Sequence, residues 1–79
     1  MTVHAQVLNI LSDATKVAPE SLRDDTALDA IGLDSLGLLE VSLAVQKDLD
    51  LPVDEGDLAE ARTVGELIGL IEEVHARVA

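Results

Sequence analysis

Aliphatic residues recur at helical spacing along most of this chain, and no useful length alternates apolar and polar residues with the period of two that a strand requires. The chain has no Phe, Tyr or Trp, so Leu, Ile, Val and Ala must fill the core. Each buried Leu, Ile or Val contributes about 1.5–3 kcal/mol, which suits one small core in a chain of 79 residues. We therefore expect residues 1–79 to form a single all-α domain.

The spacing predicts a first helix over residues 3–17, with Thr2 as its N-cap. Pro19 excludes helical geometry from the residue before it, which ends this helix. Residues 19–34 are rich in turn-forming residues and lack a sustained period. We expect them to form a long ordered loop that is anchored to the helices by its apolar residues, Leu22, Leu28, Ile31 and Leu33.

A second helix is predicted from Ser35, its N-cap, to about Leu49. A short third helix is predicted over residues 55–61, with Asp54 as its cap. The fourth begins at a capping box formed by Thr63 and Glu66 and runs to about residue 77. The prediction is a four-helix bundle of three longer helices and one short third helix.

In the fourth helix Gly65 and Gly69 stand four residues apart. In a membrane span this spacing would indicate helix dimerisation. In an amphipathic helix of this kind it predicts instead that the helix packs closely within the bundle.

The second helix has two apolar faces. On a helical wheel the core face collects Leu38, Val41, Val45 and Leu49. Leu36 and Leu43 lie roughly opposite, and Leu39 lies at the boundary. The second face could belong to a central helix buried on all sides, or consist only of scattered surface leucines, which are common. The other interpretation is a docking surface of leucines surrounded by charge.

Acidic residues dominate the middle of the chain. The net charge is −11, and residues 20–60 hold twelve acidic residues against Arg23 and Lys47, a net charge of −10. This surplus argues against binding nucleic acid or anionic lipid, both of which need a basic face. Asp34, Glu40 and Asp48 would place negative charge along the leucine face and attract a basic partner. A solvated acidic surface that only aids solubility is the alternative.

No residue pattern indicates an independent enzyme. There is no cysteine, and neither His4 nor His75 is spaced to act with a serine and a carboxylate. Frames begun at Asp29 and Asp48 both fail the calcium-loop pattern, so we expect no metal site. No apolar run approaches the length of a membrane span. We expect a cytoplasmic monomer.

One segment combines unusual features: Gly32-Leu33-Asp34-Ser35-Leu36. A flexible turn delivers a serine to the start of a helix, after a long loop and just before the second apolar face. The serine could be only a helix cap. A phosphate on it would lie near the free N–H groups at the positive end of the helix dipole, a favourable place for an anion.

With these residues the sequence resembles the acyl carrier proteins, whose motif is Asp-Ser-Leu at the start of the second helix. The likeness extends over nearly the whole chain, and includes the Asp24-Asp25 loop, the Leu51-Pro52-Val53 turn and the opening of the last helix at Thr63. The resemblance implies an acyl-carrier-protein-like bundle and a non-catalytic carrier. In it Ser35 accepts 4′-phosphopantetheine from coenzyme A, and the arm carries acyl groups as thioesters.

The resemblance also implies partners. They are a phosphopantetheinyl transferase and ketosynthase, acyltransferase or acyl-ligase type enzymes, which would recognise a surface made of Asp34, Leu36, Glu40, Leu43 and Asp48. Acyl chains would shelter between the second and third helices and the core.

Three positions depart from the pattern of carriers in fatty acid synthesis. Gly37 stands where many of those carriers have an acid, and Gln46 and Lys47 stand where they favour two acids. These departures favour a discrete carrier of bacterial polyketide or related specialised biosynthesis. A fatty-acid-synthesis carrier, a peptidyl or aminoacyl carrier, and a cofactor-free acidic interaction module are the alternatives.

Overall fold

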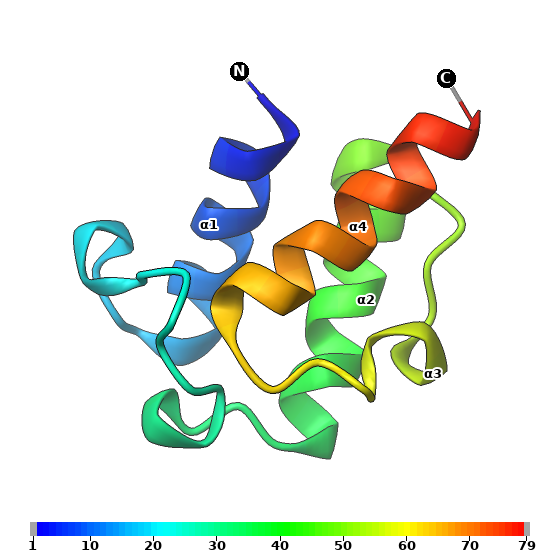
Figure 1. Ribbon diagram of the computed structural model, residues 1–79. Helices are drawn as coiled ribbons and strands as arrows, with labels where there is room; N and C mark the ends of the chain where they lie inside the picture. The colour runs from blue at the N-terminus through cyan, green and yellow to red at the C-terminus, as the bar shows by residue number, and fades with distance from the viewer. Residues whose placement is uncertain (1, 79) are drawn as a thin grey trace.

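The structure is a computed structural model that describes residues 2–78. These residues form four α-helices and no strand, as expected: α1 (Val3–Thr15), α2 (Ser35–Leu49), α3 (Glu55–Leu58) and α4 (Val64–Val78). α1 packs on α2 and α4, and the short α3 bridges α2 and α4 (Figure 1). The prediction of an all-α bundle with a short third helix is confirmed.

α1 begins where the sequence predicts and ends two residues earlier. The Thr2 hydroxyl accepts a hydrogen bond from the Ala5 N–H at 3.1 Å, which confirms it as the N-cap. The helix ends at Thr15 because Lys16 takes a left-handed conformation, with φ of 63°. Pro19 acts as predicted, since Ala18 before it is extended, with ψ of 140°.

The long loop is ordered by its apolar residues. Leu22, Leu28 and Leu33 are buried, and Ile31 packs on the core as a partly buried residue. The loop contains two short 3₁₀ turns that the sequence did not indicate, Pro19–Ser21 and Asp29–Ile31. Four residues from this loop therefore help to build the core between the helices.

An antiparallel bridge between Ala27 and Thr63 ties this loop to the start of α4. The Leu28 N–H donates to the Arg62 carbonyl and the Val64 N–H donates to the Thr26 carbonyl, both at 2.9 Å. The bridge joins segments more than thirty residues apart. It fixes the connection between α3 and α4 opposite the loop that leads into α2.

The start of α4 differs in detail from the predicted capping box. The Thr63 hydroxyl accepts from the Glu66 N–H at 3.2 Å, as expected. The Glu66 carboxylate accepts from the Arg62 N–H at 2.9 Å and not from that of Thr63. Glu66 therefore holds the residue one position earlier and secures the bridge as well as the helix.

Close packing by the two glycines of α4 is confirmed at one position and wrong at the other. A Cβ on Gly65 would lie 2.9 Å from the Asp24 carbonyl oxygen, and nothing lies within 4 Å of a Cβ on Gly69. The close neighbour of Gly65 is the long loop and not another helix. The Gly65 N–H donates to that same carbonyl at 2.9 Å, which explains the close approach.

α3 is a single turn and ends at Leu58, three residues before the predicted end. Its cap is the predicted one: the Asp54 carboxylate accepts from the Asp57 N–H, and the Asp57 carboxylate accepts from the Asp54 N–H. Residues 59–61 instead form a turn and linker. That linker becomes one wall of the groove described below.

Aliphatic side chains build the core, as the lack of aromatic residues requires. Sixteen are buried within residues 2–78, drawn from all four helices, the long loop and the α2–α3 connection: Val7, Ile10, Leu11, Leu22, Leu28, Leu33, Val41, Val45, Leu51, Val53, Leu58, Val64, Leu67, Ile68, Ile71 and Val74. Ser42 is the one buried polar residue in this part of the chain, and its hydroxyl donates to the Leu39 carbonyl at 2.8 Å. No helix in it is long and apolar enough to cross a membrane.

Candidate functional site at the start of α2

Asp34, and not Ser35, is the N-cap of α2. The Asp34 carboxylate accepts from the Gly37 N–H at 2.9 Å, and its carbonyl accepts from the Leu38 N–H at 2.8 Å. Ser35 is the first residue of the helix. The predicted cap is therefore wrong by one position, because aspartate and serine are comparably good caps and the extended backbone of residue 34 selects the aspartate.

This arrangement leaves the Ser35 hydroxyl without a structural task. The Ser35 side chain is exposed, and its hydroxyl makes no hydrogen bond within residues 2–78. The alternative that Ser35 serves only as a helix cap therefore fails. A serine held rigidly by a capped helix, with its hydroxyl open to solvent, can be modified without loss of a stabilising contact.

The first turn of α2 can accept a phosphate. Its capping hydrogen bonds use the N–H groups of Gly37 and Leu38, which leaves those of Ser35 and Leu36 for solvent or an anion. These groups lie at the positive end of a 15-residue helix. The residues present therefore fit a phosphodiester carried on the Ser35 hydroxyl.

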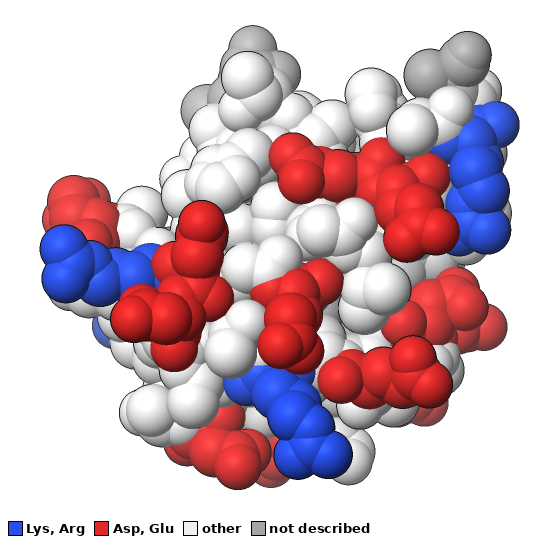
Figure 2. Space-filling model, in the orientation of Figure 1, with Lys and Arg blue, Asp and Glu red and all other residues white. Residues whose placement is uncertain are grey.

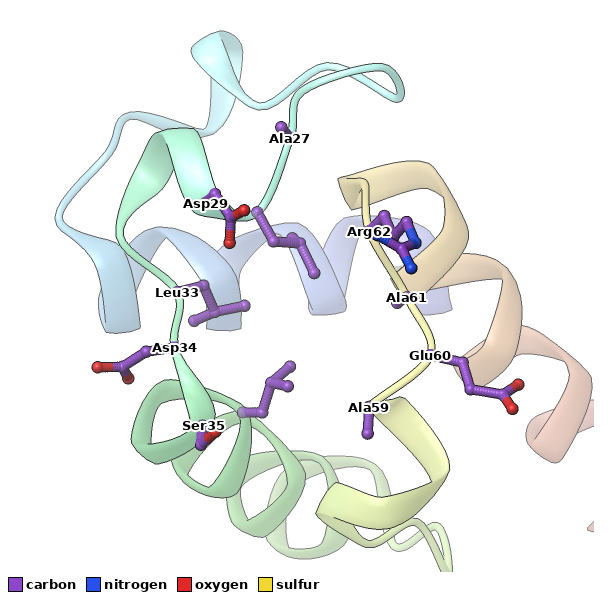
Figure 3. A pocket seen from close by; sticks show the side chains of 11 residues that line it. Ala27, Asp29, Leu33, Asp34, Ser35, Ala59, Glu60, Ala61 and Arg62 are labelled. Atoms are coloured by element: carbon purple, nitrogen blue, oxygen red, sulfur yellow. The ribbon is translucent and has the colours of Figure 1, made fainter.

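An open groove of about 710 Å³ lies beside Ser35. One wall is the segment that leads into α2, with Asp29, Leu33 and Ser35, and the opposite wall is the linker between α3 and α4 (Figure 3). Leu28 and Leu38 also line it. A flexible group attached to Ser35 would have an apolar surface to lie on within reach of its anchor.

Gly37 has a packing reason to be glycine. A Cβ at this position would lie 2.7 Å from Cδ1 of Leu33, whose side chain covers the first turn of α2 and is buried. Leu33 also forms part of the groove wall beside Ser35. Glycine at residue 37, a departure from the family pattern, thus allows the Leu33 side chain to pack closely on the first turn of α2.

The second apolar face of α2 is exposed, which excludes a helix buried on all sides. Leu36 is 63% exposed and Leu43 is 54% exposed, while Leu39 is 37% exposed. On the core side, Val41 and Val45 are fully buried and Leu38 and Leu49 pack on the core as partly buried residues. α2 is therefore not a central helix buried on all sides.

The acidic residues predicted to surround these leucines divide between two places. Asp34 precedes Leu36 at the start of the helix, but its carboxylate is engaged in the cap. Glu40 and Asp48 line a shallow groove with Asp13 of α1. A helix turns about 100° per residue, so Asp48 points about 140° away from Leu43. The structure brings Asp48 to the α1 side of α2 and not to the leucines.

Gln46, one of the two departures late in α2, also has a structural role. Its side-chain amide donates to the Val53 carbonyl and thus fastens the connection between α2 and α3. A carboxylate at this position could not donate that hydrogen bond. The lower acidity of this end of α2 therefore follows in part from the need for a hydrogen-bond donor to the α2–α3 connection.

The two histidines lie away from this site. His4 is exposed near the start of α1 and His75 near the end of α4, and neither lines the groove. In the described part of the chain no three His, Cys, Asp or Glu residues are grouped to hold a metal ion. The site therefore offers an exposed hydroxyl beside an open groove, and its residues do not include an aligned base and nucleophile.

Sequence reasoning missed the linker side of the groove. Ala59, Glu60, Ala61 and Arg62 line it, and none of them was singled out. The periodic pattern suggested that residues 59–61 continue a helix, and nothing local indicated that they face Ser35. Their position depends on the bridge between Ala27 and Thr63, which is a contact between distant segments.

Comparison with known proteins agrees with this geometry. Residues 5–71 match the family model described as "Phosphopantetheine attachment site". An acyl carrier protein of Bdellovibrio bacteriovorus is 26% identical over 74 residues, covering 92% of this chain and 95% of the relative. One of Chlamydia trachomatis is 30% identical, covering 92% and 96%. The conidial pigment polyketide synthase PfmaE of Pestalotiopsis fici is 36% identical over 64 residues, which are 81% of this chain and 3% of that protein.

The fold, the exposed serine and the family match define a carrier domain with a phosphopantetheine attachment site. Within that class the chain belongs to the acyl carrier protein family. Members are non-catalytic carriers that bear a covalent 4′-phosphopantetheine and work with a phosphopantetheinyl transferase and synthase enzymes. The family assignment favours the carrier over a cofactor-free interaction module.

Proposed function

We propose that Ser35 is the attachment site of 4′-phosphopantetheine and that the arm carries acyl intermediates as thioesters. The supporting observation is the exposed Ser35 hydroxyl, which is released from capping by Asp34 and lies beside an open groove. In the loading reaction the serine oxygen forms the new bond to phosphorus. The pyrophosphate bond of coenzyme A breaks, and adenosine 3′,5′-bisphosphate leaves.

The test is intact-mass analysis of the apo protein after incubation with coenzyme A, Mg²⁺ and a broad-specificity transferase. The wild type should gain the mass of one phosphopantetheine, and Ser35→Ala should gain none while its circular dichroism spectrum stays helical. Ser21→Ala, at another exposed serine, is the matched control and should load like the wild type. Equal loading of Ser35→Ala would show that the arm is attached elsewhere.

The exposed face of α2 is proposed as the surface that partner enzymes recognise. Leu36 and Leu43 supply apolar contact area, Asp34 and Glu40 supply negative charge, and Asp48 extends the charge toward α1. A surface of this kind suits a basic partner with an apolar centre. Phosphopantetheinyl transferases and ketosynthase, acyltransferase or acyl-ligase type enzymes are the proposed partners.

Leu36→Ala and Leu43→Ala should change the free energy of unfolding by no more than about 0.5 kcal/mol, because both side chains are exposed. They should nevertheless raise KM for the transferase that loads Ser35. Val78→Ala, at an equally exposed apolar residue on α4 (55%), is the control and should leave KM unchanged. An unchanged KM in both α2 variants would remove the leucines from the transferase interface.

The proposed pathway is bacterial polyketide or related specialised biosynthesis, in the cytoplasm, with the chain acting as a discrete monomeric domain over residues 1–79. The support is the 36% identity to a segment of a polyketide synthase and the reduced acidity at Gly37, Gln46 and Lys47. A fatty-acid-synthesis carrier and a peptidyl or aminoacyl carrier are the alternatives. The mass of the acyl group on the arm after expression in the native host would distinguish them.

A further inference from the structure

The groove beside Ser35 contains one cation. Arg62 is the only Lys or Arg among its lining residues. Its side chain lies on the linker wall, across the groove from Ser35 (Figure 3). Carboxylates of the same lining do not occupy the guanidinium, because no ion pair joins Arg62 to another of residues 2–78. The Arg62 guanidinium is therefore free to bind an anionic group attached to Ser35.

The backbone holds Arg62 at this position from both sides. Its carbonyl accepts from the Leu28 N–H and its N–H donates to the Glu66 carboxylate, each at 2.9 Å. The bridge between Ala27 and Thr63 adjoins it. The side chain is exposed, yet its Cα is fixed relative to the loop that leads into Ser35. The arginine side chain therefore starts from a fixed point beside the groove.

Two of the three acidic residues of the lining, Asp34 and Glu60, direct their carboxylates away from the groove. The Asp34 carboxylate caps α2, and Figure 3 shows the Asp34 and Glu60 side chains pointing outward on opposite sides. Asp29 is the remaining acid of the lining. The rest of the lining is apolar: Leu28, Leu33, Leu38 and the alanines 27, 59 and 61. The groove thus combines an apolar surface with one guanidinium on the linker wall and one carboxylate, that of Asp29, on the wall of Ser35, and these two groups form no ion pair with each other.

From this arrangement we propose that Arg62 binds a carboxylate at the end of an acyl group carried on Ser35, so that the groove favours short acyl groups bearing a carboxylate. This inference rests on the proposed attachment at Ser35. Guanidinium groups form paired hydrogen bonds with carboxylates. An exposed pair of this kind is weak when its partners are free, but a tether supplies a high effective concentration. The acyl group's own carboxylate is thus the ligand that the groove can hold.

The test loads the apo protein from malonyl-coenzyme A, acetyl-coenzyme A or coenzyme A, with a broad-specificity transferase, and confirms each product by intact mass. NMR then follows hydrogen exchange at the Arg62 Nε–H. Exchange should be slower in the malonyl form than in the acetyl form, by up to about fivefold. The Nε–H of Arg23, which lies outside the groove lining, should exchange equally in both forms.

A second measurement observes the ligand. With ¹³C in the free carboxyl group of the malonyl unit, its chemical shift at neutral pH should differ between the wild type and Arg62→Ala. Arg23→Ala makes the same charge change outside the groove and should leave that shift unchanged.

Three outcomes separate the hypotheses. Failure of Ser35 to load would refute the proposed function. Normal loading with equal Arg62 exchange in the malonyl and acetyl forms would overturn the carboxylate site alone. Exchange that is slower than in the apo protein by the same factor in all three loaded forms would identify the arm's phosphodiester as the ligand. That result would also overturn the carboxylate site.

Discussion

Asp34 and Ser35 have separate roles at the start of α2. Asp34 satisfies the first turn of α2, and Ser35 presents a hydroxyl with no hydrogen bond inside residues 2–78. Aspartate and serine are both favoured at N-cap positions. The sequence could therefore predict a helix start here but not which residue caps it. The choice depends on the backbone of the loop, where Gly32 has φ of 75° and residue 34 is extended.

Asp34→Ala should lower the free energy of unfolding by about 1 kcal/mol, because the Gly37 N–H loses its acceptor. Asp34→Asn keeps an oxygen acceptor and should cost much less. Urea denaturation of both variants measures the difference. If the alanine and asparagine variants were equally stable, the carboxylate at 2.9 Å from the Gly37 nitrogen would not be acting as the cap.

Among the elements, α1, α2 and α4 could be predicted well because each has a sustained apolar stripe and a clear start signal. For α3 the start and the Asp54 cap could be predicted but the end could not, since one turn of helix carries too little periodicity to define it. The two 3₁₀ turns were not predicted. The linker wall of the groove was missed for a different reason. Its place depends on hydrogen bonds between residues 24–28 and 62–65, which no local pattern reveals.

The two glycines of α4 give a matched test of the contact between the long loop and the start of α4. Gly65→Ala should destabilise the protein, because its Cβ would lie 2.9 Å from a backbone oxygen of the long loop. Gly69→Ala meets nothing within 4 Å and should stabilise the protein by up to about 1 kcal/mol through helix propensity. Thermal unfolding of both variants should therefore shift in opposite directions. A rise in Tm for both would mean that the loop does not press on α4 at residue 65.

At the scale of the whole molecule, acidic charge is widespread. Figure 2 shows acidic side chains over much of one face, with basic side chains confined to a few positions. The net charge is −11 in a chain of 79 residues. Composition alone predicted this surplus, and it predicted that aliphatic residues would have to build the core. The wheel placed Asp48 along the leucine face, but in the folded chain it lies on the α1 side of α2.

Repulsion among these charges should make stability depend on salt. Raising sodium chloride from low to moderate concentration shortens the range of the repulsion and should raise Tm by a few degrees, since 1 kcal/mol corresponds to about 4–8 °C in a domain of this size. Calorimetry at several salt concentrations measures the effect, and the double variant Asp24→Asn, Asp25→Asn should show a smaller increase. A Tm independent of salt would contradict the repulsion argument.

The account depends most on Ser35 as the bearer of the arm. Peptide mapping by tandem mass spectrometry, on protein purified from its native host, tests this directly. The account predicts that phosphopantetheine is found on the peptide containing Ser35, with the fragment ions placing it on that side chain. Phosphopantetheine on any other residue of the purified protein would contradict it.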